Sequence, residues 1–241
     1  MIPSRLPGLP AAVDTGFEND GGNMGEPFAV KDCALITIAT GERTQNLQEL
    51  RDRLMTTHQG CIYYHFWGGL LRASFDDPEY QNDFAAWAWR GLHDARLAER
   101  LALVDPSEYA DLEGLRRELI DVIEERLEET EHIPWARHDR QFYFMRSQII
   151  VFDTNIRIHN IEGLALHIQR FSRSSIFYHF IDARRRTTGR RDDFSEWLLG
   201  FGDEHAPMVQ RLAAIDPYFS TLTELRDEIA GCMNRYVYRG R

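Results

Sequence analysis

Apolar residues recur at helical spacing in two stretches of the chain. They stand three or four positions apart from Phe84 to Leu101, and again from Leu112 to Leu127. This period places apolar side chains on one face of an α-helix and leaves the other face polar. The pattern therefore predicts an amphipathic helix over each stretch.

Two other segments are rich in β-branched and aromatic residues, which favour strands. The clearer one reads FYFMRSQIIVFDTNIRI from Phe142, and the more ambiguous one reads FAVKDCALITIATG from Phe28. We expect a short strand or two in each. The predicted fold class is mainly α, with α+β as the alternative.

Blocks of similar sequence recur in the same order in the two parts of the chain. At an offset of 114, IYYHF at 62–66 matches IFYHF at 176–180. After small gaps, NDFAAW matches DDFSEW, RLALVDP matches RLAAIDP, and LEGLRREL matches LTELRDEI. We infer a tandem duplication with repeat units at 28–133 and 142–238. The two pseudo-symmetric helical units are expected to share one small sheet or to pack about a pseudo-twofold axis.

Composition limits the class of protein. Residues 1–27 hold four prolines, five glycines and few large apolar groups, which predicts a flexible leader. The chain has no apolar run of membrane-spanning length and no secretory signal, so we expect a cytoplasmic protein without a membrane partner. Its three cysteines form no close pair, and its net charge of −10 disfavours nucleic-acid binding.

Several acids and amides shared by the two units are explained by helix capping. Asn46, followed by Glu49, predicts a capping box. Asp83 and Asp193 stand before Phe-x-x-Trp and are expected to cap the helices that follow. Asp-Pro at 105–106 and at 216–217 predicts two further helix starts.

The shared Tyr-His pairs are not explained by capping. The aromatic neighbours of each histidine indicate burial, which lowers the pKa and favours the neutral ring. We expect these pairs near the interface between the units, in one groove or in a pocket for each unit. The candidate ligand-binding residues are Tyr64, His65, Arg72, Tyr178, His179 and Arg186.

A metal site is the alternative use of the same histidines. If His65 and His179 met across the pseudo-twofold axis, Asp83 and Asp193 would complete a set of ligands for a divalent transition metal. A core histidine bonded to a carbonyl or to a capping aspartate is the purely structural interpretation. After the histidine the units differ, with Trp67-Gly68-Gly69 against Ile181-Asp182-Ala183, so a site is expected to work in one unit only.

The run RRRTTGRR at 184–191 is interpreted as a solvated loop, with an anion site as the alternative. Through the four repeated blocks the chain resembles a bacterial and archaeal family of unknown function, over most of residues 28–238. The resemblance implies a role linked to carbohydrate metabolism and brings no catalytic residue with it.

Two functions remain open from the sequence. The favoured one is a helical protein that binds a metabolite or a partner protein in the groove between its units, with homo-oligomers allowed. The alternative is a metal-dependent enzyme that uses His65 and His179.

Overall fold

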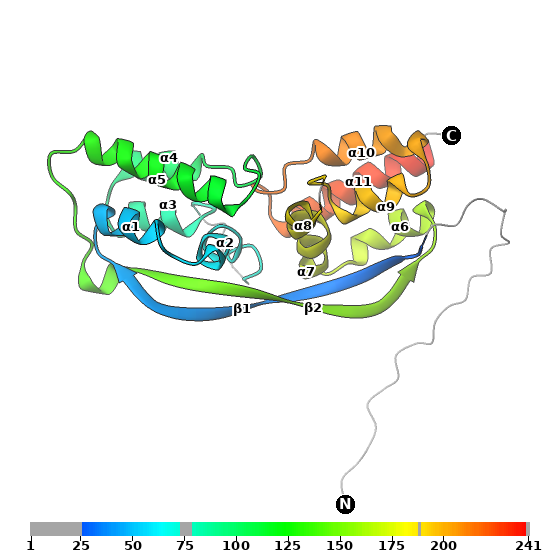
Figure 1. Cartoon of the computed structure of the whole chain (residues 1–241). Helices are drawn as coiled ribbons and strands as arrows, with labels where there is room; N and C mark the ends of the chain where they lie inside the picture. The colour runs from blue at the N-terminus through cyan, green and yellow to red at the C-terminus, as the bar shows by residue number, and fades with distance from the viewer. Residues whose placement is uncertain (1–25, 73–78, 188, 240–241) are drawn as a thin grey trace, which may run out of the picture.

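Two long strands form the base of the molecule. The computed structural model describes residues 26–72, 79–187 and 189–239. In it, β1 (Phe28–Thr44) and β2 (Phe142–Ile158) pair antiparallel as a two-stranded ribbon that arches beneath the helices (Figure 1). The expectation of short strands was wrong, because each strand runs for 17 residues and pairs with the other along most of its length. The predicted leader lies outside the described residues up to position 25.

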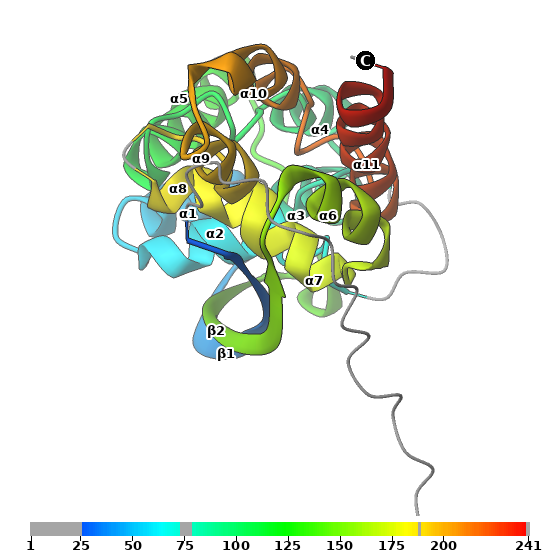
Figure 2. The same ribbon diagram turned by 90° about the vertical axis from the view of Figure 1, so that its right-hand side faces the viewer.

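Helices form two groups above the ribbon, and both groups lie on the same side of it (Figures 1 and 2). The first group follows β1 and consists of α1 (Leu47–Leu54), α2 (Gln59–Trp67), α3 (Asp83–Arg90), α4 (Ala95–Ala102) and α5 (Leu112–Glu128). The second group follows β2 and consists of α6 (Ile161–His167), α7 (Arg173–Ile176), the π-helical segment η3 (Phe177–Asp182), α8 (Ala183–Arg186), α9 (Asp193–Leu199), α10 (Ala206–Ala213) and α11 (Leu222–Arg239). The prediction of a mainly α protein is confirmed.

The ribbon is interrupted by two irregularities that resemble each other. The register shifts between Val30 and Lys31, and again between Ala39 and Arg43. At the second shift the Thr40 hydroxyl donates to the Phe144 carbonyl over 2.7 Å. At the first, the hydroxyl of Thr154, 114 positions after Thr40, donates to the Val30 carbonyl over 2.6 Å. The residues that follow the two threonines, Gly41 and Asn155, both have positive φ, as chain bends of this kind require.

Each group of helices packs on the strand that leads into the other group. Helix α2, which follows β1, packs against β2, whereas α7, which follows β2, packs against β1. The hydrophobic core repeats this arrangement. Phe66 and Phe84 are fully buried in the first group, and Phe180 and Phe194 are fully buried in the second. Each strand is therefore held by helices from both groups, since α1 also contacts β1 and α6 contacts β2.

The stretch from 83 to 101 is two helices, which corrects the prediction of one. Gly91 ends α3, and His93 has a φ of 56°, a left-handed conformation that breaks a helix. Asp94 then caps α4 by accepting from the Leu97 amide at 3.1 Å. The apolar period continues across the break because both helices turn the same face to the core. The helix predicted from Leu112 is present as α5.

The capping predictions hold at one site and shift at others. Asn46 and Glu49 form the expected box at α1. The caps of α3 and α9 are Asn82 and Asp192, one residue before the predicted aspartates. Asp105 and Asp216 were expected to start helices but instead accept amide protons inside loop turns. Helices α5 and α11 begin seven and six residues further on, respectively. An Asp-Pro pair supplies either structure, so the local sequence does not distinguish them.

Candidate functional site

His65 joins the first group of helices to the second strand. It lies on α2, is 4% exposed and packs against the rings of Phe84 and Phe142. Its Nδ1 lies 2.8 Å from Oδ2 of Asp83, and its Nε2 accepts from the backbone amide of Met145 at 3.1 Å. A backbone N–H can only donate, so the ring is neutral with its proton on Nδ1. Burial lowers the pKa of His65, which agrees with this neutral form.

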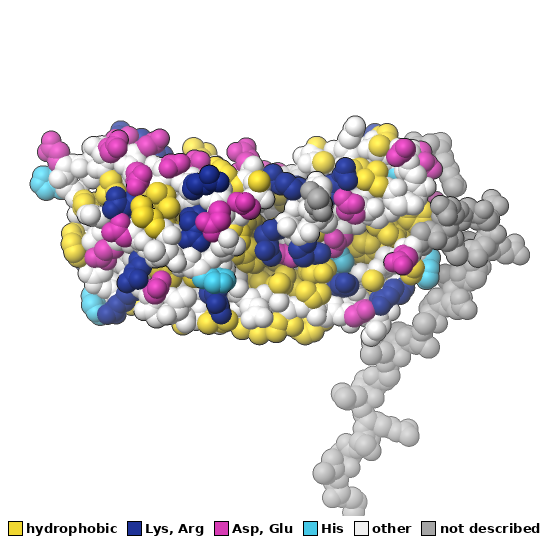
Figure 3. Space-filling model, in the orientation of Figure 1, with side chains coloured by type: hydrophobic (Ala, Val, Ile, Leu, Met, Phe, Trp, Pro, Cys, Tyr) yellow, Lys and Arg dark blue, Asp and Glu magenta, His cyan; other side chains and the backbone are white. Residues whose placement is uncertain are grey.

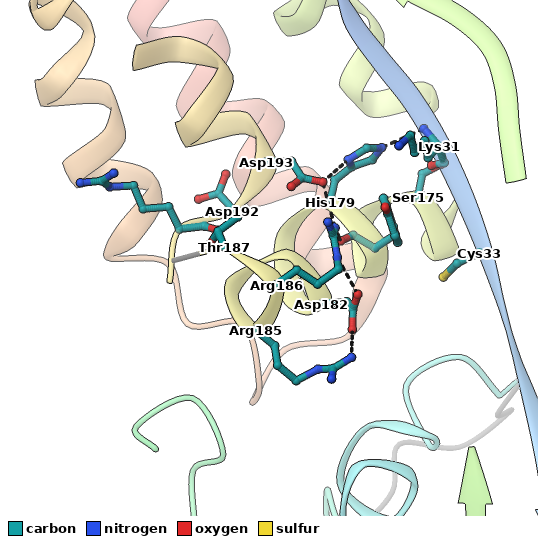
Figure 4. Close-up of polar contacts among 12 residues, drawn as sticks. Lys31, Cys33, Ser175, His179, Asp182, Arg185, Arg186, Thr187, Asp192 and Asp193 are labelled. Carbon is teal, nitrogen blue, oxygen red and sulfur yellow. Dashed lines mark hydrogen bonds and ion pairs between the residues drawn. The ribbon is translucent and has the colours of Figure 1, made fainter. Parts of the chain in front are cut away.

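His179 makes the same contacts in the opposite direction. Its Nδ1 lies 2.7 Å from Oδ2 of Asp193, and its Nε2 accepts from the amide of Lys31 at 2.8 Å (Figure 4). Lys31 belongs to β1 and stands 114 positions before Met145. The Ser175 hydroxyl adds a bond to the Lys31 carbonyl at 2.7 Å. The helices therefore satisfy backbone groups at the edges of the ribbon, which would otherwise be free to pair with other chains.

These contacts contradict the predicted metal site. His65 binds the amide of Met145, which pairs with Ala39, and His179 binds the amide of Lys31. Ala39 and Lys31 are eight residues apart, which corresponds to about 26 Å along a strand. In each ring both nitrogens already have partners. Among the described residues, no group of three or more His, Cys, Asp or Glu side chains could hold a metal ion. His65, His179, Asp83 and Asp193 therefore form two separate structural pairs, and the shared site was wrong.

The arginine seven residues after each histidine is held differently in the two groups. Arg186 donates from Nε to Asp182 at 2.8 Å and from Nη2 to Asp193 at 3.0 Å (Figure 4). Arg72, its counterpart 114 positions earlier, donates to the Tyr64 hydroxyl and lies 3.8 Å from Asp83. Arg186 is thus fixed by two carboxylates, and Arg72 by a phenol and one distant carboxylate.

Asp182 is the buried acid that causes this difference. It is 1% exposed and accepts from Arg185 and Arg186, and also from the phenol of Tyr63 at 3.0 Å. Tyr63 lies on α2, so this bond crosses between the two groups of helices. Burial, followed by the charge of Asp182, raises the pKa of Tyr63, so the phenol stays protonated and donates.

A cavity of about 520 Å³ opens at the junction of the two groups of helices, next to Tyr63 and Asp182. We call it the central cavity. Lys and Arg side chains gather near this junction on the face shown in Figure 3. Its walls combine aromatic, acidic and basic side chains, among them Tyr63, Trp67, Glu108, Tyr109, Asp182, Arg184, Arg185 and Arg190.

The three arginines of the central cavity come from the run at 184–191. Arg184 lies over the Phe180 ring at 4.5 Å and reaches the Leu212 carbonyl at 3.3 Å. Arg185 lies over the Tyr63 ring at 4.7 Å, and Arg190 donates to the Tyr109 carbonyl at 2.8 Å. The run begins within α8 and Arg184 is half-buried, so the interpretation as a solvated loop is wrong for Arg184, whereas Arg185 and Arg190 are exposed as that interpretation expects.

A second cavity, of about 450 Å³, lies between the middle of β1, the end of α2 and the start of α7. We call it the ribbon cavity. Tyr64 and Arg72 line it, as expected of a pocket built by a tyrosine and a nearby arginine. The other predicted ligand-binding residues line neither the central cavity nor the ribbon cavity: His65, Tyr178, His179 and Arg186.

The structure also brings forward residues that the repeat comparison passed over. Asp182 and Arg185 have no counterparts of their kind in the first unit, where Gly68 and Leu71 stand, so a search for shared residues excludes them. The same search excludes Tyr63, because its counterpart is Phe177. A useful signal was present: the arginine run continues directly from an apolar segment, so its first side chains had to lie near the core.

The ribbon and the paired helix groups define a mainly α protein built on a two-stranded antiparallel sheet. The chain belongs to a family of unknown function (DUF5752), which matches residues 25–234. This confirms the resemblance to an uncharacterised family. A solved structure, that of OrfY from Thermoproteus tenax, is similar over 88% of this chain and 96% of that chain, with 27% identity and a TM-score of 0.76. No curated protein matches the chain.

The described helices were also compared with what a bilayer requires. None of them combines the length and the apolar character of a membrane-spanning segment.

Proposed function

We propose that the protein binds a small phosphorylated, hydroxyl-rich metabolite of the carbohydrate type in the central cavity. The observation that best supports this is Arg184. Burial lowers the pKa of its guanidinium, and among the described residues no carboxylate lies within ion-pair distance of it. A desolvated cation beside a cavity, bonded only to carbonyl oxygens, is well placed to receive an anion.

The size and mixed lining of the central cavity support a metabolite more than a protein surface. Its volume falls within the range of ordinary small-molecule pockets. Arg184, Arg185 and Arg190 offer guanidinium groups to phosphate oxygens, because planar guanidinium donors match that geometry. Glu108 offers acceptors to hydroxyl groups. The flat face of Trp67 offers a surface against which a ring can pack.

We further propose that the chain is a tandem duplication, in which each unit contributes one strand to the ribbon. The matched threonine bonds at the two register shifts and the reciprocal histidine contacts support this proposal. In such a molecule the central cavity lies between the units. It has no second copy, because its arginines belong to the second unit only. We expect the protein to act in the cytoplasm and to need no nucleic acid.

Isothermal titration calorimetry tests the proposed ligand. Glucose 6-phosphate, inorganic phosphate and glucose serve as probes, and we expect binding in that order of strength. Arg184→Gln should weaken binding of the sugar phosphate by about tenfold, as expected from loss of one charge-assisted contact. Arg53→Gln is the matched control, because Arg53 is half exposed, pairs with Glu42 and lies outside both cavities.

The proposal fails if none of the three probes binds, or if Arg184→Gln and Arg53→Gln bind the sugar phosphate equally well. Binding of glucose as strongly as glucose 6-phosphate would also contradict it, because the arginines would then have no role.

A further inference from the structure

The ribbon cavity lies at the place where the two helix groups differ most. In the second group, the carboxylate of Asp182 occupies the space beside Arg186 and binds its Nε at 2.8 Å. The counterpart of Asp182 in the first group is Gly68, which lines the ribbon cavity together with Arg72. Where the second group has a buried acid, the first group therefore has no carboxylate.

Arg72 is left with weak partners by this exchange. Its guanidinium lies over the Tyr64 ring at 4.9 Å and is bonded to the Tyr64 hydroxyl. The only carboxylate within ion-pair distance of it in the described part of the chain is Asp83, at 3.8 Å, and Asp83 is already bonded to His65. The guanidinium of Arg72 thus retains donors that Arg186 uses on its own chain.

We propose that the ribbon cavity binds a small aliphatic monocarboxylate, whose carboxylate group accepts from Arg72 as Asp182 accepts from Arg186. The proposal concerns a second site, independent of the metabolite proposed for the central cavity. A guanidinium binds the two oxygens of a carboxylate through parallel N–H donors, as it does between Arg186 and its acids.

The remaining walls suit the rest of such a ligand. Hydroxyl groups of Thr37 and Ser174 line the cavity and provide donors, whereas the Ser172 hydroxyl already donates to Asp32 at 2.9 Å. Arg173 adds a second positive charge at its rim, and the structure gives this side chain no carboxylate partner among the described residues. Leu35 and Leu71 supply apolar surface for a short alkyl chain.

Cys33 does not oppose an anion in this cavity. Its thiol lies 3.4 Å from the Ser174 carbonyl, and burial raises its pKa to about 12. The thiol is therefore uncharged at neutral pH and repels no carboxylate. A strongly charged anion fits less well, because the Asp32 carboxylate, which accepts from Ser172, lies beside the cavity.

Backbone amide shifts measured by two-dimensional NMR test the site in the intact chain. The probes are propionate, the neutral propionamide and inorganic phosphate, each at millimolar concentration. We expect propionate to shift the amides of Gly68, Leu35 and Ser174 in a saturable manner, whereas propionamide leaves them in place. Phosphate should shift them less than propionate does.

Variants identify the group that recognises the carboxylate. Arg72→Gln should weaken propionate binding by about tenfold. Arg72→Lys keeps the charge and loses the planar donors, so its affinity for propionate should lie between those of the wild type and Arg72→Gln. Arg53→Gln controls for the change in net charge. The spectrum of each variant also reports whether it remains folded, and Arg72→Lys provides the comparison if Arg72→Gln does not.

Three results would overturn the assignment. They are equal shifts with propionamide, stronger binding of phosphate than of propionate, or unchanged propionate affinity in both Arg72 variants. None of them bears on the central cavity, because the sugar phosphate experiment reads a different set of residues.

Discussion

The two histidine rings make the same contacts to the ribbon, and their regions differ one turn later. His65 and His179 each bind an aspartate through Nδ1 and, through Nε2, a backbone amide of the strand that leads into the other helix group. One turn beyond, the first region has Gly68 and an open cavity, and the second has Asp182 and a closed network. The histidine contacts to the ribbon occur in both regions, whereas the residues beside the cavities differ between them.

There is a physical reason why the histidine contacts to the ribbon must be present in both regions. Each histidine satisfies a backbone group at one edge of the ribbon, and loss of either would leave a buried N–H without a partner. Gly68 and Asp182 satisfy no backbone group of the ribbon, so the ribbon contacts do not require the same residue at this position. Residues on the outer side of the ribbon are likewise not fixed by helix contacts, because Ile36, Ile150 and Phe152 are partly exposed there. Figure 3 shows apolar side chains along that edge.

The largest expected difference between the two regions is the cost of removing the arginine. Arg186→Gln should lower the free energy of unfolding by about 3 kcal/mol, because it leaves the buried Asp182 with less compensation. Arg72→Gln should cost no more than about 1 kcal/mol, because its ion pair is long and half exposed. Urea unfolding measures both, and equal losses would contradict the comparison.

The histidines should instead behave alike. His65→Ala and His179→Ala should each lower the free energy of unfolding by about 2 kcal/mol, since each leaves one ribbon amide unpaired. Glutamine at the same positions keeps an acceptor and should cost less. Chemical denaturation of the four variants checks this, and a loss at only one of the two positions would show that the regions are not equivalent.

A smaller contrast is expected at the first helix of each group. Asn46 caps α1 together with Glu49, whereas Asn160 caps α6 alone, because Gly163 stands at the position of the glutamate. Asn160→Ala should therefore cost about 1 kcal/mol, and Asn46→Ala somewhat more. Thermal unfolding of both variants reports the order, and the reverse order would refute the role given to Glu49.

The smallest expected effect is a pH dependence from His65. Burial holds its pKa below the value of 6.5 that it has when exposed, so the unfolded chain binds the proton more readily than the folded one. Its contribution to stability is complete above pH 6.5 and is lost as the pH falls below that value. Unfolding midpoints of the wild type and of His65→Gln between about pH 7 and 5 should diverge in this direction. Parallel curves would argue against a neutral buried ring.

Much of the local structure was predictable from the sequence. The helical period located α5, the capping box located the start of α1, and the repeated blocks placed the histidines in equivalent positions. Prediction was less successful where a local signal has two outcomes. The break at His93 did not disturb the apolar period, and the Asp-Pro pairs formed turns in place of helix starts. The extent of the strands was also missed, because their length depends on pairing with a partner 114 residues away.

The sequence by itself determined the mainly helical fold, the repeated order of its blocks, and the burial of two aromatic-flanked histidines. Local side-chain chemistry is sufficient for these properties, since helix period, capping and burial each depend on residues close in the chain. Only the tertiary structure decided what the histidines bind and which residues line the cavities. The reason is that the antiparallel register of the ribbon sets which backbone amide meets each ring, and no local pattern encodes a register between segments so far apart.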